Sequence, residues 1–126
     1  MYTLSVNSAI TGDGAGINSK ASVQTPGADK NEVILAPNSV NVEIDMAIDI
    51  STVKGLVLLA TADTTLKTNS TSAPDDTINL FAGRDNTFID GQGEVQFGTD
   101  VTKIYASSLN GGTLTIWNFY DSTPSQ

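Results

Sequence analysis

Apolar and polar residues alternate with a period of two in several parts of the chain, and this spacing is typical of half-buried β-strands. The clearest case spans residues 40–49, where apolar side chains occupy the even positions and mainly polar, acidic ones the odd positions. One face of this strand should meet a core, and the other should meet water. Residues 2–7 alternate in the same way, whereas residues 56–60 are apolar throughout, as expected for a strand covered on both sides.

Further short apolar segments, separated by turn residues, predict the remaining strands. They lie near Val23, at 33–35, from Leu66 onward, and at 77–81, 87–89, 94–97, 101–108 and 113–120. Residues 49–54 fit one helical turn or a corner, with Asp49 or Ser51 as its N-cap. Asn110-Gly111-Gly112 predicts a hairpin between the last two strands, because Asn-Gly supplies the positive φ angles of a primed turn.

These segments make nine to ten strands, spaced by roughly 8–12 residues, and no long window keeps helical spacing. The pattern predicts an all-β fold, a single antiparallel sandwich or barrel. A length of 126 residues suits one domain, which we expect to span residues 1–126. Within it, the glycine-rich segment 9–19 predicts a flexible loop that could equally become ordered against a partner, and the polar tail 121–126 should fray.

The chain is strongly acidic, with 14 acidic and 6 basic residues and a net charge of −8. Such a surface repels a phosphate backbone and lacks the basic stripe that nucleic-acid binding requires. The same charge disfavours anionic lipid surfaces, and the longest apolar run, residues 55–60, is too short to span a bilayer. The N-terminus lacks the basic start and apolar stretch of a signal peptide. We therefore expect no nucleic-acid or membrane partner, and synthesis in the cytoplasm.

Histidine and cysteine are absent. Their absence removes the usual general base near neutral pH, the common nucleophile pairs and the commonest metal ligands. A carboxylate pair such as Glu43 with Asp45 fits a solvated strand face better than the two-carboxylate site of a glycosidase. The acidic glycine-rich segments 12–14 and 90–94 are oxygen-rich, but neither has the spacing of a calcium loop. We expect no enzyme activity, no cofactor and no metal site.

The last predicted strand carries large apolar side chains on both faces, although a sandwich strand should bury only one. Leu114 and Ile116 lie in one phase, and Trp117 and Phe119 in the other. Trp117 and Phe119 could enter the core after a bulge or under a loop, form a subunit or docking interface, or make a sugar-stacking platform. Tyr105 is similarly out of phase with its neighbours. We assign Tyr105, Trp117 and Phe119 as candidate interface residues.

Three segments consist of short strands joined by tight polar turns: LLATADTTLKTNSTSAPDDTINLFAG at 58–83, TDVTKIYASS at 99–108 and TLTIWNFYDSTP at 113–124. They resemble small virion structural proteins of tailed bacteriophages, and the resemblance covers roughly residues 45–124. It implies a single antiparallel β-sandwich of jelly-roll type that coats or joins parts of the particle rather than catalysing a reaction.

Within the virion structural proteins that the resemblance implies, we favour a capsid decoration or cement protein that stabilises the assembled shell. Its partners would be the major capsid protein or other virion proteins and further copies of itself, as a trimer at a local three-fold axis. It would be located in the virion. The alternative is a tail, fibre or head-fibre component that binds host carbohydrate, and a third interpretation, an enzyme on the same fold, is disfavoured by the missing His and Cys.

Overall fold

The computed structural model describes residues 1–12, 15–91 and 93–122. Strands account for 64% of the chain, and the described residues form no helix. The ten strands are β1 (Tyr2–Gly12), β2 (Ala15–Thr25), β3 (Gly27–Leu35), β4 (Ser39–Ile48), β5 (Val53–Ala60), β6 (Thr64–Thr68), β7 (Thr77–Leu80), β8 (Asn86–Ile89), β9 (Val101–Ser108) and β10 (Gly112–Tyr120). The prediction of an all-β antiparallel fold is confirmed.

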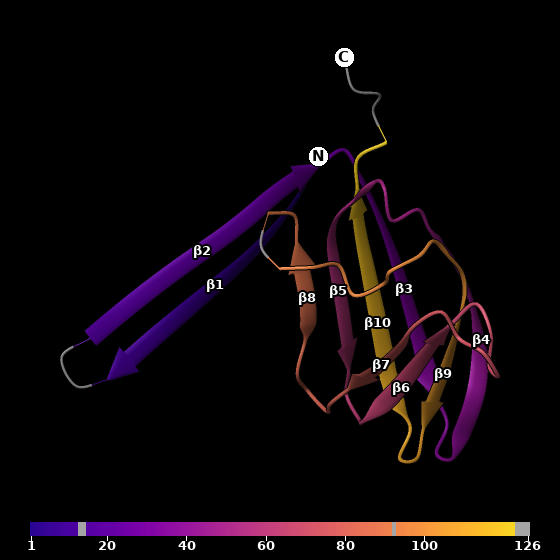
Figure 1. Cartoon of the computed structure of the whole chain (residues 1–126). Coiled ribbons are helices and arrows are strands. Elements are labelled where there is room, and N and C mark those ends of the chain that lie inside the picture. The colour runs from indigo at the N-terminus through magenta and orange to yellow at the C-terminus, as the bar shows by residue number, and fades with distance from the viewer. Residues whose placement is uncertain (13–14, 92, 123–126) are drawn as a thin grey trace.

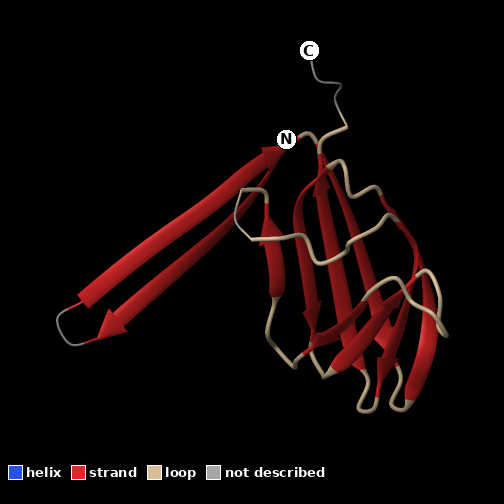
Figure 2. Cartoon of the chain, in the orientation of Figure 1, coloured by secondary structure: helices blue, strands red, loops and turns tan. Residues whose placement is uncertain are grey.

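Eight of the strands form two four-stranded antiparallel sheets that pack face to face as a sandwich (Figure 1). The β3 sheet has the order β3-β10-β5-β8, and the β4 sheet has the order β4-β9-β6-β7. Strands β1 and β2 form a separate two-stranded sheet. This hairpin, which we call the arm, projects from the sandwich on the side of β8 (Figure 2). Because the described residues contain no helix, none of them forms a helix that could cross a membrane.

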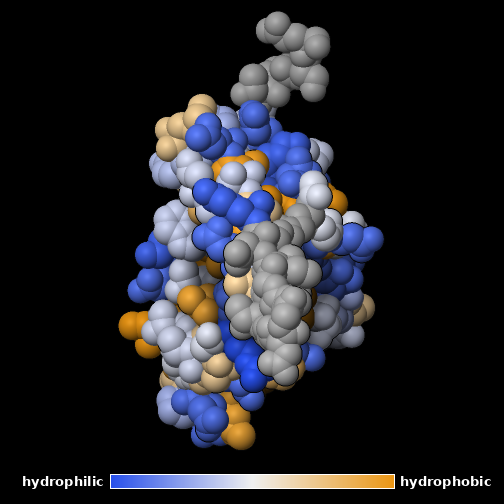
Figure 3. Space-filling view, turned by 90° about the vertical axis from the view of Figure 1, so that its left-hand side faces the viewer, coloured by the Kyte–Doolittle hydropathy of each residue, from blue (hydrophilic) through white to orange (hydrophobic). Residues whose placement is uncertain are grey.

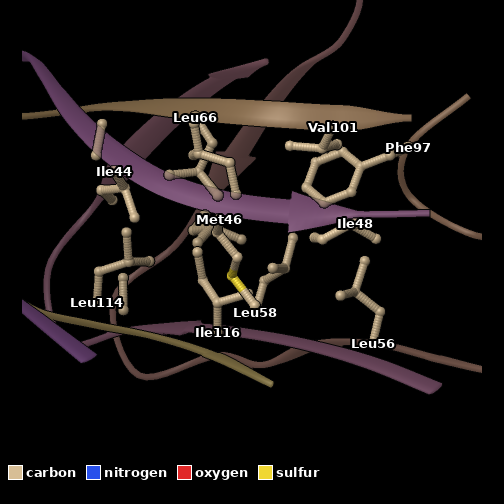
Figure 4. Packing of buried hydrophobic residues seen from close by; sticks show 14 of the residues in the cluster. Ile44, Met46, Ile48, Leu56, Leu58, Leu66, Phe97, Val101, Leu114 and Ile116 are labelled. Carbon is tan, nitrogen blue, oxygen red and sulfur yellow. The ribbon is translucent and has the colours of Figure 1, made fainter. Parts of the chain in front are cut away.

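The core lies between the two sheets, where the inward-facing side chains of both meet. Ile44, Met46 and Ile48 of β4 are each 7% exposed or less, as the alternation in residues 40–49 predicts. The prediction is wrong for Val40, which is 74% exposed because the strand pairing is irregular between Ser39 and Val42. Across the core the three buried side chains face apolar side chains of the opposite sheet, namely Leu114, Ile116, Leu58 and Leu56 (Figure 4). Because each such side chain contributes about 1.5–3 kcal/mol when fully buried, this interdigitated layer is the main source of stability.

The segment 94–97 is not a strand, so that prediction is wrong. It is part of the connection between β8 and β9, and Phe97, fully buried, packs into the core beside Val101 (Figure 4). The Gln96 side-chain amide donates to the main-chain oxygen of Asn86 on β8 at 3.0 Å. A side-chain hydrogen bond therefore joins this segment to β8, instead of the main-chain hydrogen bonds of a paired strand. Apolar residues here anchor a loop, which a short sequence window does not distinguish from a buried strand.

The predicted hairpin between the last two strands is also wrong. β9 lies in the β4 sheet and β10 in the β3 sheet, so the connection crosses from one sheet to the other. The left-handed residues are Gly111 and Gly112, with φ of 76° and 125°, and not Asn110. The turn packs on the loop between β3 and β4, where the Asn38 amide donates to the oxygen of Leu109 at 2.8 Å. Each of the two strands is already flanked by two others within its own sheet.

The arm replaces most of the loop predicted at 9–19. Residues 9–12 and 15–19 belong to β1 and β2, and the register pairs Ile10 with Ile17. The glycines suggest a loop in sequence because they lower strand propensity, but pairing between the two segments is a non-local property. Of the predicted frayed tail, residues 121 and 122 have no regular structure, and 123–126 lie outside the described residues.

Residues 49–52 form a corner and not a helix. The Asp49 carboxylate accepts from the Ser51 amide at 3.0 Å, so Asp49 does cap this turn, as the sequence suggests. The Thr52 amide donates to the main-chain oxygen of Asp49 at 3.0 Å, and β5 begins at the next residue.

Candidate interaction surface

The two-faced pattern of the last strand is explained by what covers each face of β10. Leu114 and Ile116 are fully buried in the core. Trp117 and Phe119 project from the outer face of the β3 sheet, away from the core. Phe119 is nevertheless only 8% exposed, and it does not belong to the core cluster. Something outside the sandwich must therefore cover it.

The base of the arm provides this cover. Phe119 pairs with Gly55 on β5, and Gly55 pairs with Ile89 on β8. A Cβ atom on Gly55 would lie 2.6 Å from Leu4 Cδ2 and 3.5 Å from the Phe119 side chain, so the missing side chain makes room for Leu4. Ile89 is 3% exposed, also outside the core cluster. We call Leu4, Gly55, Ile89 and Phe119 the arm-base cluster.

Trp117 lies next to this cluster and is held on two sides. Its ring stacks on Phe119, with centroids 5.5 Å apart and an interplanar angle of 12°. The Lys30 Nζ lies 5.5 Å from the centroid of the Trp117 ring, in the geometry of a cation–π contact, and 3.3 Å from a carboxylate oxygen of Glu32. Trp117 is half-buried, so a fixed aromatic surface remains accessible to solvent.

Further apolar side chains continue from Trp117 along the outer face of the β3 sheet. Val57 pairs with Trp117, and Leu59 pairs with Thr115. All four residues are half-buried. We call Trp117, Val57, Leu59 and Thr115 the Trp117 stripe. Seen from the side of the arm, the rest of the surface is mostly hydrophilic, with hydrophobic residues in small separate patches (Figure 3).

Tyr105 lies on the other side of the molecule. It is half-buried on β9, between Ile104 and Ala106, which point into the core. Its cross-strand neighbours on the outer face of the β4 sheet are Glu43 and Lys67. Since the outer faces of the two sheets point in opposite directions, the structure does not bring Tyr105 together with the two other candidate interface residues.

The surroundings of Tyr105 are charged. Lys103 forms a salt bridge with Glu43, and it pairs across the strands with Asp45. The hydrogen bond and the charge of Glu43 raise the pKa of Lys103 above its ordinary value of 10.5. Exposed pairs of this kind contribute little to stability. This face is a solvated, partly neutralised surface, which agrees with the interpretation of Glu43 and Asp45 from sequence.

A groove of about 500 Å3 opens at the end of the sandwich opposite the base of the arm. Three of its apolar residues are largely exposed: Val40 at 74%, Phe81 at 58% and Leu109 at 74%. Polar groups lie beside them, and the Thr65 hydroxyl donates to Asn79 Oδ1 at 3.0 Å. This groove is not predictable from the sequence alone, because its walls come from four separate strand ends. The available signal is the large apolar residues Phe81 and Leu109 directly after strands.

No cluster of three or more acidic residues that could hold a metal ion occurs within the described ranges. The two oxygen-rich glycine segments considered from sequence include residues 13, 14 and 92, which lie outside the described residues. No family model matches the chain, and no curated protein or solved structure is significantly similar to it. Its function must therefore be inferred from its own fold and surfaces.

Proposed function

We propose that the chain is a structural protein of a bacteriophage virion that binds an assembled capsid as a decoration or cement protein. The observation that carries the proposal is the nested pairing of the eight sandwich strands. β3 pairs with β10, β4 with β9, β5 with β8 and β6 with β7. This order is that of one long antiparallel hairpin rolled into two sheets. It supports a sandwich of jelly-roll type, the architecture used by many viral capsid domains.

The surface chemistry supports a role in assembly rather than in catalysis or DNA binding. The chain has no His or Cys and a net charge of −8, with a single arginine, Arg84. A protein of this kind stabilises a shell by binding the assembled state and not its free subunits, so its effect follows mass action. The partner is the major capsid protein or another virion protein, and the site is on the virion surface.

A homo-oligomer, most simply a trimer at a local three-fold axis, belongs to this proposal. Shell-binding proteins share the symmetry of the site that they occupy, and closed symmetric assemblies are the usual form of soluble oligomers. The half-buried Trp117 beside Phe119 supports a contact on the outer face of the β3 sheet, since aromatic side chains are enriched at interface centres.

The test is to add the purified chain to capsids stripped of their accessory proteins. Binding should saturate at a fixed ratio to the capsid subunit, and the melting temperature of the shell should rise. Isolated tails serve as the control, and their melting temperature should stay unchanged. Absence of saturable binding to shells would refute the proposal.

The exposed groove favours a second candidate, a tail, fibre or head-fibre component that binds host carbohydrate. Apolar Phe81 and Leu109 beside amide and hydroxyl groups suit a sugar, which has an apolar face and polar edges. Saturable binding to isolated tails would transfer the assignment to this candidate. Binding to host glycans would do the same if it is lost in Phe81→Ala and kept in the control Thr102→Ala, which lies on a distant exposed face.

A further inference from the structure

The arm is amphipathic. Its register places Leu4 opposite Val23 and Val6 opposite Ala21. These four side chains are half-buried, and we call them the apolar face of the arm. Residues in the opposite phase are polar and exposed: Thr3, Ser5, Asn7, Lys20, Ser22 and Gln24.

Only the base of this apolar face is in the arm-base cluster. Toward its tip the arm projects away from the sandwich (Figure 1). The antiparallel register continues toward the tip, and Ser8 lies in the phase of Leu4 and Val6. An isolated two-stranded hairpin is at best marginally stable in water. The projecting part of the arm therefore requires a further surface.

The Trp117 stripe is a surface of the required chemistry. It adjoins the arm-base cluster directly, because Trp117 stacks on Phe119. The Leu4 contact at Gly55 shows that a side chain of the arm fits the outer face of the β3 sheet. The stripe extends this existing contact surface beyond the point where the arm of the same copy leaves it.

Charge favours a second copy as the occupant. Asp13 and Lys20 are the only charged residues among the first 25, so the arm region is neutral and the net charge of −8 lies entirely in residues 26–126. Two sandwiches that approach each other repel. The neutral arm is the part of one copy that can contact another with the least repulsion, and the Lys30–Glu32 pair leaves the β3 side of the stripe without net charge.

We propose that the arm of one copy lies across the Trp117 stripe of a second copy with its apolar face inward. In a trimer, a contact between these two different surfaces runs head-to-tail and closes a ring when the rotation between copies permits. The inference rests on the homo-oligomer of the proposed function and identifies its contact, but it does not depend on binding to capsids.

Disulfide trapping tests the contact directly, since the chain contains no cysteine. Ser8→Cys lies in the phase of the apolar face, and Thr115→Cys lies in the stripe. The two single variants, one carrying a mass tag, are mixed at high micromolar concentration and oxidised. A mixed disulfide dimer should form. The matched control replaces Ser8→Cys by Ser5→Cys, which points from the polar face, and should give far less mixed dimer.

Two results would overturn the inference. The first is that no mixed disulfide dimer forms with Ser8→Cys, or that Ser5→Cys gives as much mixed dimer as Ser8→Cys. The other is a double Ser8→Cys/Thr115→Cys variant that closes its disulfide within one chain at every dilution, because the arm would then cover its own sheet.

The lone tryptophan gives a second readout on the unmodified chain. Emission of Trp117 should move to shorter wavelength as concentration rises, and Val6→Asn should abolish this shift while Ser5→Asn keeps it. A shift that survives Val6→Asn would contradict the arm as the occupant. If no disulfide is trapped between arm and stripe while capsids still bind the chain at a fixed ratio, the arm contact is refuted and the capsid-binding function stands. If the disulfide is trapped but capsids do not bind the chain, the arm contact stands and the capsid-binding function is refuted.

Discussion

At the scale of single residues, positions that the sequence makes look alike have opposite roles. Phe97 and Phe81 both lie near loops, yet Phe97 is fully buried in the core and Phe81 is 58% exposed at the groove. Phe97→Ala should lower the free energy of unfolding by about 3–5 kcal/mol, because it removes core contacts and leaves a cavity. Phe81→Ala, the control, should change it by about 0.5 kcal/mol or less. Urea denaturation measures both, and equal losses would contradict this view of the 93–100 connection.

Gly55 is a position where a side chain is excluded by the arm and not by the backbone. A Cβ there would meet the end of the flexible Leu4 side chain at 2.6 Å. Gly55→Ala should therefore displace the arm while changing the unfolding of the sandwich little, and the amides of β1 and β2 should exchange faster with solvent. Gly98→Ala is the control, since its Cβ would meet only Asp76, at 3.7 Å. Unchanged exchange in the arm would show that Leu4 does not hold it.

The charged face around Lys103 gives a prediction about pH. Since the hydrogen bond and charge of Glu43 raise the pKa of Lys103, the pair's small contribution to stability is complete below the ordinary value of 10.5 and is lost as pH rises through the raised pKa. In an NMR titration, Glu43→Gln should move the midpoint of Lys103 to lower pH. A midpoint that stays in place would mean that Glu43 is not the cause.

At the scale of elements, the Asn69 side chain joins several connections at the strand ends opposite the groove. Asn69 Oδ1 accepts from the Thr102 amide at 2.8 Å, and its Nδ2 donates to Asp75 Oδ2 at 2.7 Å and to the oxygen of Asp100 at 2.8 Å. Asn69 also has a φ of 68°, which most residues with a side chain disfavour.

Two substitutions separate these contributions. Asn69→Gly keeps the left-handed backbone and loses the hydrogen bonds, whereas Asn69→Ala loses both. Both variants should be less stable than the parent chain, and Asn69→Ala should be worse by about 1 kcal/mol. Thermal and urea unfolding check the order. If Asn69→Gly matched the parent, the side-chain hydrogen bonds would have no net value.

The limits of sequence reasoning are visible in the same elements. The alternation in β4 was enough to predict that Ile44, Met46 and Ile48 face the core, because which face a side chain takes is set locally by the pleat. Pairing partners are not local. The Asn-Gly turn after β9 suggested a hairpin, but the flanking strands bond to strands far away in the chain.

The candidate surface was predictable only in part. That Trp117 and Phe119 share a face follows from their spacing, and an unusual role for that face follows from the apolar residues on both sides of β10. The burial of Phe119 is not predictable from the spacing, because it depends on Leu4, 115 positions earlier in the chain, lying against the same sheet. Phase alone groups Tyr105 with them, and phase carries no information on which sheet a strand joins.

At the scale of the whole molecule, charge and apolar contact act in opposite directions on self-association. Because the net charge of −8 lies in the sandwich and the arm is neutral, copies should repel at long range, and the proposed contact between arm and stripe supplies the attraction at short range. Salt screens the repulsion, with a Debye length of about 10 Å at 0.1 M, and leaves apolar contact intact. We therefore predict that raising sodium chloride from low to moderate concentration increases the oligomer fraction measured by light scattering.

The direction of this salt effect discriminates between two kinds of interface. An interface held by ion pairs, such as one built on Lys103 and Glu43 of the β4 sheet, would weaken as salt rises, whereas an arm held by apolar burial should strengthen. Val6→Asn should remove the salt-promoted oligomer without altering the fold, and Lys103→Met should leave it in place. Dissociation by salt, or loss of the oligomer in Lys103→Met, would move the interface from the Trp117 stripe to the opposite face, where Tyr105 lies.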